Sequence, residues 1–128
     1  MKIEVSIGEV VDKITILQIK KEKINDEVKL KYINEELIIL KNSLEKENVD
    51  IPEKLVKNLK HINELLWDAE DIIRLKEKNN LFDEEFVHCA RLDAQLNDKR
   101  FLAKNEINNY CNSLIKEQKS YDGLYSAN

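Results

Sequence analysis

The sequence predicts an all-α protein, a bundle of about four mostly antiparallel helices that follow a short extended segment at the N-terminus. Three observations predict this class. The 128 residues include only 2 Gly and 1 Pro, so the chain has few of the residues that form turns. Leu, Ile, Lys and Glu are abundant, and all of these except β-branched Ile lose little side-chain freedom in a helix. Apolar residues recur at intervals of three and four positions, which is the period of an amphipathic helix.

The length of the chain fits one domain with one hydrophobic core. We expect a single helical domain at residues 1–119. Residues 120–128 include Gly123 and lack the helical period, so we expect a mobile C-terminal tail there.

The first helix is predicted at residues 7–24. Alternating apolar residues before it are typical of an extended segment, and Ser6 stands three residues before Glu9, as in a capping box. The helix ends at Asn25, because the apolar period stops there. The apolar positions that predict its buried face are Ile7, Val10, Val11, Ile14, Leu17 and Ile24.

The second helix is predicted from the seam of a coiled-coil-like contact. Its apolar positions step by three and four without a break, at Leu30, Ile33, Leu37, Leu40 and Leu44. Ile38 and Ile39 lie beside this seam and make the middle of the helix apolar over much of its circumference. We therefore expect this helix to sit centrally or at a contact between subunits.

The third helix is predicted to begin after Asp50, with Asp50 as its N-cap and Pro52 in its first turn. It ends near Asn79, and we expect Leu81 and Phe82 to pack into the core from the loop that follows. Its buried stripe consists of Leu55, Leu59, Ile62, Leu66, Ala69 and Ile73.

The fourth helix is predicted to begin at Asp83, which caps it. Its stripe is unusual because Asp93 and Arg100 stand where apolar side chains would be expected. The other members of this stripe are Cys89, Leu96, Ala103, Ile107, Tyr110 and Leu114.

Composition narrows the possible functions. A formal net charge of −4 argues against a dedicated nucleic-acid-binding protein, which needs a basic face to displace counterions. No stretch approaches the roughly 20 apolar residues of a membrane span, and the first residues lack the apolar core of a signal peptide. Cys89 and Cys111 lie far apart on one predicted helix and cannot bond to each other, so we expect reduced thiols and a cytoplasmic location.

Three stretches of the chain together resemble a family of uncharacterised small proteins from bacteria and their phages. They follow the patterns GE-x-x-DK-x-TIL-x-IK at residues 8–20, LW-x-x-ED-x-IR at residues 66–74, and LND-x-R at residues 96–100. Residues 119–121 are also similar. Where that family contains glycine before the last helix, this chain has Asn79 and Asn80. The resemblance implies kinship over nearly the whole chain but no activity or catalytic residue.

Acidic residues of the third helix form one candidate site. Asp68, Glu70 and Asp71, followed by Arg74, resemble the acidic helix with which all-α nucleotide pyrophosphatases bind Mg²⁺. Such an enzyme needs a second acidic pair in matched spacing, and the next helix offers none. We therefore expect a solvated helix face here, and Mg²⁺ only under the alternative hypothesis of a hydrolase.

The fourth helix contributes half of a second metal pattern. Glu85 and His88 stand three residues apart, as in the di-iron carboxylate proteins. His61 has no Glu three residues before it, so the second half is missing. We expect His88 to be an ordinary surface histidine.

A polar strip on the fourth helix is the candidate that we favour. Asp93, Asn97 and Arg100 follow one another at intervals of one helical turn beside an apolar stripe. A buried charge needs a partner, and for Arg100 this would be Glu70, Asp71 or a ligand. The strip therefore predicts either a network of ion pairs between helices or a ligand site.

The first turns of the helix at residues 7–24 provide a further candidate, because backbone N–H groups there favour anions. Asp12 and Lys13 are adjacent and project in different directions, so we expect both at the surface. The candidate ligand-binding residues are thus Arg100, Asn97, Asp93, Arg91 and Lys13, and none is assigned a catalytic role.

The leading hypothesis is a non-catalytic, homo-oligomeric binding module without a cofactor. It would receive a protein partner or a small anionic, nucleotide-like ligand, and ligand sequestration by a phage protein would be one such function. The alternatives are a Mg²⁺-dependent nucleotide hydrolase that uses Asp68, Glu70 and Asp71, and a structural adaptor. We expect neither a nucleic acid nor a membrane as a partner.

Overall fold

The structure, a computed structural model, describes residues 1–112 and contains four α-helices. These are α1 (Ile7–Lys23), α2 (Glu27–Lys46), α3 (Glu53–Lys78) and α4 (Glu84–Cys111). The described residues include no strand, which confirms the predicted all-α class and the number of helices. The predicted tail at residues 120–128 lies outside the described part of the chain.

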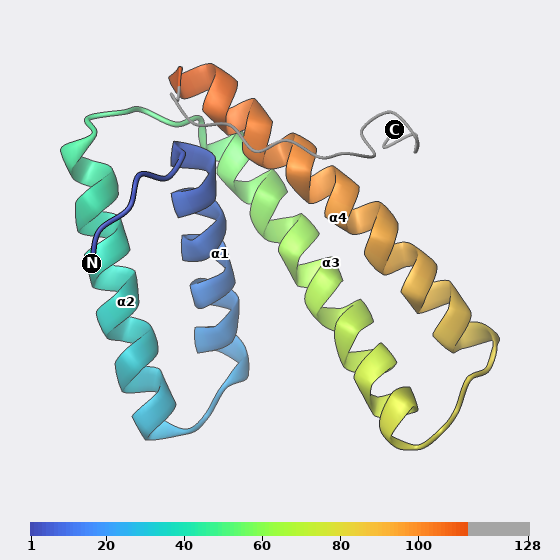
Figure 1. The fold of residues 1–128 in the computed structure, drawn as a ribbon. Coiled ribbons are helices and arrows are strands. Elements are labelled where there is room, and N and C mark those ends of the chain that lie inside the picture. The colour runs from blue at the N-terminus through green and yellow to red at the C-terminus, as the bar shows by residue number, and fades with distance from the viewer. Residues whose placement is uncertain (113–128) are drawn as a thin grey trace.

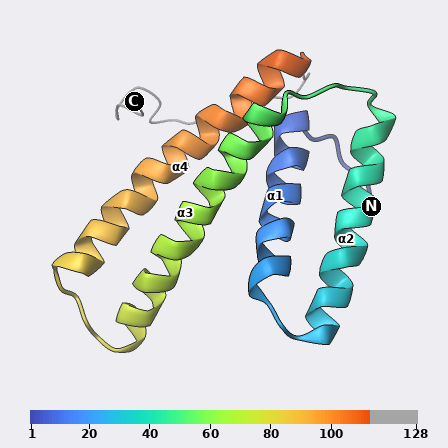
Figure 2. The ribbon, with the colours of Figure 1, turned by 180° about the vertical axis from the view of Figure 1, so that it is seen from behind.

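The helices form two antiparallel hairpins, α1–α2 and α3–α4 (Figure 1). Helix α1 lies between α2 and the α3–α4 hairpin, as the two opposite views show (Figures 1 and 2). It packs against all three other helices, whereas α2 packs closely against α1 alone. The central position predicted for the second helix is therefore wrong: α2 lies at the edge, because its seam needs only α1 to bury it.

Two groups of buried side chains hold the helices together, and α1 contributes to both. The larger core fills the junction of α1, α3 and α4, and it consists of Val11, Leu55, Leu59, Ile62, Leu66, Leu96, Ala103 and Ile107. The smaller core joins α1 to α2 and consists of Ile14, Leu17, Ile33 and Leu37. Within the described residues, no helix is long and apolar enough to cross a membrane.

Polar side chains fix the starts of three helices. Ser6, Asp26 and Asp83 are the N-caps of α1, α2 and α4, and each accepts a hydrogen bond from the backbone N–H three residues later. Helix α3 begins differently, because its N-cap is Pro52 and no side chain caps it. The prediction of Asp50 as N-cap is therefore wrong, although the predicted boundary of the helix is close.

Asparagine ends the helices where glycine commonly does so. Asn48, Asn80 and Asn112 adopt positive φ angles of 52°, 54° and 53°, one or two residues after the ends of α2, α3 and α4. This left-handed conformation is disfavoured for most L-residues, and Asn tolerates it better than most. Asn80 thus serves at the end of α3 the conformational purpose that glycine commonly serves.

The tip of the α3–α4 hairpin is held by ion pairs rather than by buried apolar side chains. Lys76 contacts Asp83 at 2.8 Å and Glu85 at 3.0 Å. Leu81 and Phe82 are more than half exposed, so the prediction that they pack into the core is wrong. Phe82 instead packs edge-to-face against Phe86, with 5.2 Å between the ring centroids.

Candidate functional site

Polar side chains join α1, α3 and α4 in a cluster of contacts that we call the junction. One part of it is a close approach of α1 to α4. The N–H of Gly8 donates a 2.6 Å hydrogen bond to Oδ1 of Asn108, so a side chain of α4 satisfies one of the free donors at the start of α1. A Cβ atom at Gly8 would lie 2.8 Å from this oxygen and closer still to the carbonyl oxygen of Lys104. Only glycine allows the two helices to approach so closely here.

One turn further along α1, Asp12 forms the centre of the junction. Its side chain is 1% exposed, and Arg100 of α4 donates to both of its oxygens, from Nε at 2.9 Å and from Nη2 at 2.5 Å. Two parallel bonds from a guanidinium to a carboxylate form a strong, directional ion pair. The expectation that Asp12 lies at the surface is therefore wrong.

Helix α3 joins this ion pair through Asn63. Its Nδ2 donates to Oδ1 of Asp12 and to Oγ1 of Thr15, both at 3.0 Å. Thr15 in turn donates to the backbone oxygen of Asp12 at 2.8 Å. These three residues are buried, so α1, α3 and α4 are connected by a buried network in which the carboxylate of Asp12 has several donors.

A second ion pair supports the same junction one turn away. Lys104 is buried on α4, and its Nζ lies 3.3 Å from Oε2 of Glu9 on α1. The two cations of this part of α4, Arg100 and Lys104, are therefore both engaged by carboxylates of α1. We expected the partner of Arg100 on α3 or in a ligand, and the carboxylate found there belongs to Asp12.

A pattern in the sequence could have indicated this junction. Gly8, Asp12, Thr15 and Ile19 share one face of α1 at intervals of three and four residues, and all four are buried. The apolar period alone does not reveal this face, because three of these residues are small or polar. On α4 the corresponding polar positions are Asn97, Arg100, Lys104 and Asn108.

Asp93 lies outside this network, between α3 and α4. Its Oδ2 accepts a 3.4 Å hydrogen bond from Nδ2 of Asn97, whereas its buried Oδ1 has no donor among the described residues. Glu70 of α3 lies within hydrogen-bonding range of Asp93. Burial, this hydrogen bond and the charge of Asp93 raise the pKa of Glu70, against the opposing charges of Arg74 and Arg100. A protonated Glu70 would supply the donor that Oδ1 lacks.

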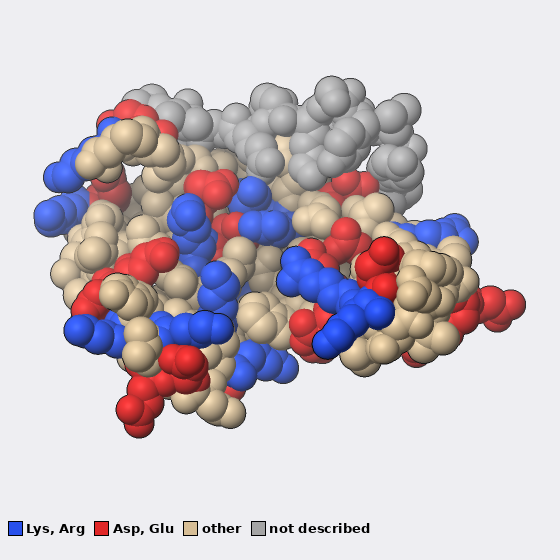
Figure 3. All heavy atoms as spheres, turned by 60° about the horizontal axis from the view of Figure 1, so that its bottom comes forward, with Lys and Arg blue, Asp and Glu red and all other residues tan. Residues whose placement is uncertain are grey.

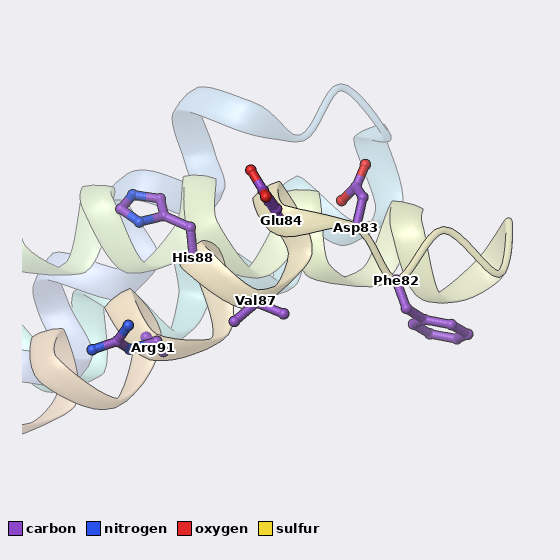
Figure 4. Close-up of a pocket in the computed structure, with 6 residues that line it drawn as sticks. All are labelled: Phe82, Asp83, Glu84, Val87, His88 and Arg91. Carbon is purple, nitrogen blue, oxygen red and sulfur yellow. The ribbon is translucent and has the colours of Figure 1, made fainter.

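The remaining candidate ligand residues lie elsewhere. Lys13 is exposed on α1, and Arg91 is nine residues before Arg100, which is about 13.5 Å along a helix. Arg91 lines an open depression of about 460 Å³ at the tip of the α3–α4 hairpin (Figure 4). Phe82, Asp83, Glu84, Val87 and His88 line it too. Glu84 and His88 point to the same side of α4, so basic and acidic groups share the depression.

The acidic residues proposed for Mg²⁺ do not gather in the structure. Asp68 is exposed and lies 4.0 Å from Lys23 of α1, Asp71 is exposed, and Glu70 faces Asp93. Among residues 1–112, no three His, Cys, Asp or Glu side chains lie where they could hold one metal ion. Basic and acidic side chains are interspersed over the face that Figure 3 shows.

The comparison with protein families gives one match. The model of a family described as being of unknown function, DUF6165, matches residues 1–128, which is the entire chain. No curated protein and no solved structure matches the chain. The match confirms the kinship that the three sequence patterns indicated.

Proposed function

We propose that this protein, which belongs to the family of unknown function DUF6165, is a non-catalytic helical binding module that acts as a homo-oligomer. The observation that carries the proposal is the exposed apolar surface of α2. Val28, Tyr32, Ile38 and Ile39 are each at least 60% exposed on a helix that packs closely against α1 alone. Large apolar side chains that gather exposed on one helix are typical of a protein interface.

Covering the exposed apolar side chains of α2 with a second chain would favour association. Fully burying one Ile or Val side chain contributes about 1.5 to 3 kcal/mol, which offsets part of the cost of bringing two chains together. A second copy of the same chain presents the same patch, which is how most soluble oligomers are built. This supports self-association through α2.

The buried cations favour a protein partner over a small anion. Arg100 and Lys104 already contact carboxylates of α1, so an anion would have to displace Asp12 or Glu9. Arg91 in the depression at the hairpin tip is the basic residue that would remain for a nucleotide-like ligand, including one sequestered by a phage protein. Thermal melts with a panel of nucleotides, on the wild type and on Arg91→Met, test this second candidate: a nucleotide that raises the melting temperature of the wild type alone would support it.

The alternative of a Mg²⁺-dependent hydrolase has less support from the geometry. Glu70, one of its three proposed ligands, turns toward Asp93 of α4 and has a raised pKa, which weakens it as a ligand for a cation. Phosphate release from nucleoside triphosphates with Mg²⁺, compared with an Asp68→Asn variant, would establish such an activity.

Light scattering on the purified protein tests the main proposal. We expect a mass of two chains or a multiple for the wild type at micromolar concentration, and one chain for Ile38→Ser. Leu75→Ser is the matched control, because Leu75 is 62% exposed on α3, away from α2. A wild type that stays monomeric at 100 µM, roughly the upper range for a specific oligomer, would overturn the proposal.

A further inference from the structure

The charges on one face of α2 are arranged antisymmetrically about Ile38. Lys31 and Glu45 stand seven residues before and after Ile38, and Glu35 and Lys41 stand three residues before and after it. Asn34 and Asn42 stand four residues before and after it. Each of these three positions on one side of Ile38 thus has an opposite charge, or the same amide, at the equivalent position on the other side.

These residues share one face of the helix. At about 100° per residue, positions seven apart differ by about 20° in direction, and positions three or four apart by about 60° or 40°. Lys31, Glu35, Lys41 and Glu45 are all exposed, and none of them forms an ion pair with another described residue. The buried seam of α2 points toward α1, on a different side of the helix. The face around Ile38 is therefore open.

We propose that α2 pairs with α2 of a second copy of this chain in antiparallel orientation, with a two-fold axis at Ile38. This inference rests on the proposed self-association and names its geometry. In such a pair Ile38 meets Ile38 of the second copy. Lys31 lies opposite Glu45, and Glu35 lies opposite Lys41, so all four charges of each helix face an opposite charge.

The same residues disfavour the other arrangement of two helices. A parallel, in-register pair would place Lys31 beside Lys31 and Glu35 beside Glu35, and like charges in contact repel. The antisymmetric pattern therefore selects the antiparallel pair, while the contact between Ile38 and its copy adds apolar attraction.

Disulfide trapping tests the position of the axis. Ile38→Cys places two thiols face to face across the axis, so a mild oxidant is expected to link most of the chains. Ile39→Cys is the matched control, because Ile39 has the same exposure but points about 100° away from Ile38. The wild type measures the background from Cys89 and Cys111. Equal trapping of both variants would overturn the antiparallel pair. The same conclusion would follow if the wild type is dimeric and Ile38→Cys is not trapped at all.

Charge exchange tests the pairing independently. Lys31→Glu should raise the dissociation constant of the dimer about tenfold, because it turns two symmetry-related attractions into repulsions. Lys31→Glu/Glu45→Lys restores both pairs and should recover the affinity of the wild type. Lys29→Glu makes the same change of charge on the side of α2 turned away from Ile38 and should have little effect. No recovery in the double variant would contradict the register, whereas a monomeric wild type would contradict the proposed function itself.

Discussion

At the scale of single residues, the junction of α1, α3 and α4 depends on a few polar contacts. Asp12 is nearly fully buried, and Arg100 neutralises it with two hydrogen bonds. A buried ion pair contributes little net stability compared with an apolar pair, but the removal of one partner leaves an isolated buried charge. The network therefore specifies how the helices meet.

Replacing Arg100 by Met measures how much the stability of the fold depends on the ion pair between Asp12 and Arg100. Met keeps much of the apolar stem but removes every donor, so Asp12 keeps the hydrogen bond from Asn63 but loses both bonds from Arg100. The free energy of unfolding should fall by about 3 to 5 kcal/mol, as measured by urea denaturation. Arg91→Met, on the same helix but exposed, should change it by about 0.5 kcal/mol or less. Unchanged stability of Arg100→Met would show that Arg100 does not hold the junction.

At the scale of helices, the contact between α3 and α4 includes two carboxyl groups side by side. The raised pKa of Glu70 means that the folded protein binds this proton more tightly than the unfolded chain does. The stabilising effect of the proton is complete below the ordinary pKa of 4.5 and is lost as the pH rises through the higher pKa of the folded state. The pair thus favours folding at acidic pH, opposite to the usual behaviour of an ion-paired carboxylate.

A Glu70→Gln variant should remove this pH dependence. The amide of Gln can donate to the buried oxygen of Asp93 at every pH, so the variant should be more stable than the wild type near neutral pH. Melting temperatures recorded at a series of pH values from acidic to neutral should fall less with rising pH for the variant. Glu106→Gln, an exposed change on α4, is the control and should leave the pH profile as it is. A variant that is less stable at neutral pH would contradict the shared proton.

The ends of the helices provide a second prediction at this scale. Asn80 has a φ of 54°, a conformation that costs alanine more than asparagine and costs glycine nothing. Asn80→Ala should lower the stability by about 1 kcal/mol, and Asn80→Gly should not. Thermal melts compare the two variants with Asn79→Ala, whose φ of −97° is ordinary. Equal effects of Ala and Gly at position 80 would disprove the conformational explanation.

The sequence is sufficient to predict the helices, but it is not sufficient to predict the polar contacts that join α1, α3 and α4. Apolar periods and capping residues indicate a helix locally, so four helices were predicted with nearly correct bounds. The partner of Arg100 stands 88 residues earlier, and no local pattern connects the two positions. The apolar residues Ile38 and Ile39 could not distinguish a central helix from one at a contact between subunits, and the structure contradicts only the central position.

At the scale of the whole molecule, two surfaces have different properties. The junction of α1, α3 and α4 is internally paired, whereas α2, which lies at the opposite edge (Figure 1), exposes apolar side chains. Under the proposed function, the junction keeps the fold fixed and α2 makes the contact with a second chain. The two roles can therefore be separated by substitutions: those on the outer face of α2 should change the assembly and leave the monomer folded.

Hydrogen exchange of the unmodified protein at low and high concentration tests the central claim, self-association through α2, most directly. Dimer formation should slow exchange of amides near Ile38, between Glu35 and Lys41, as the concentration rises through the dissociation constant. Amides at the tip of α3–α4, from Phe82 to Arg91, should exchange at the same rate at both concentrations. Exchange that is independent of concentration throughout the chain, or protection confined to that tip, would contradict the account.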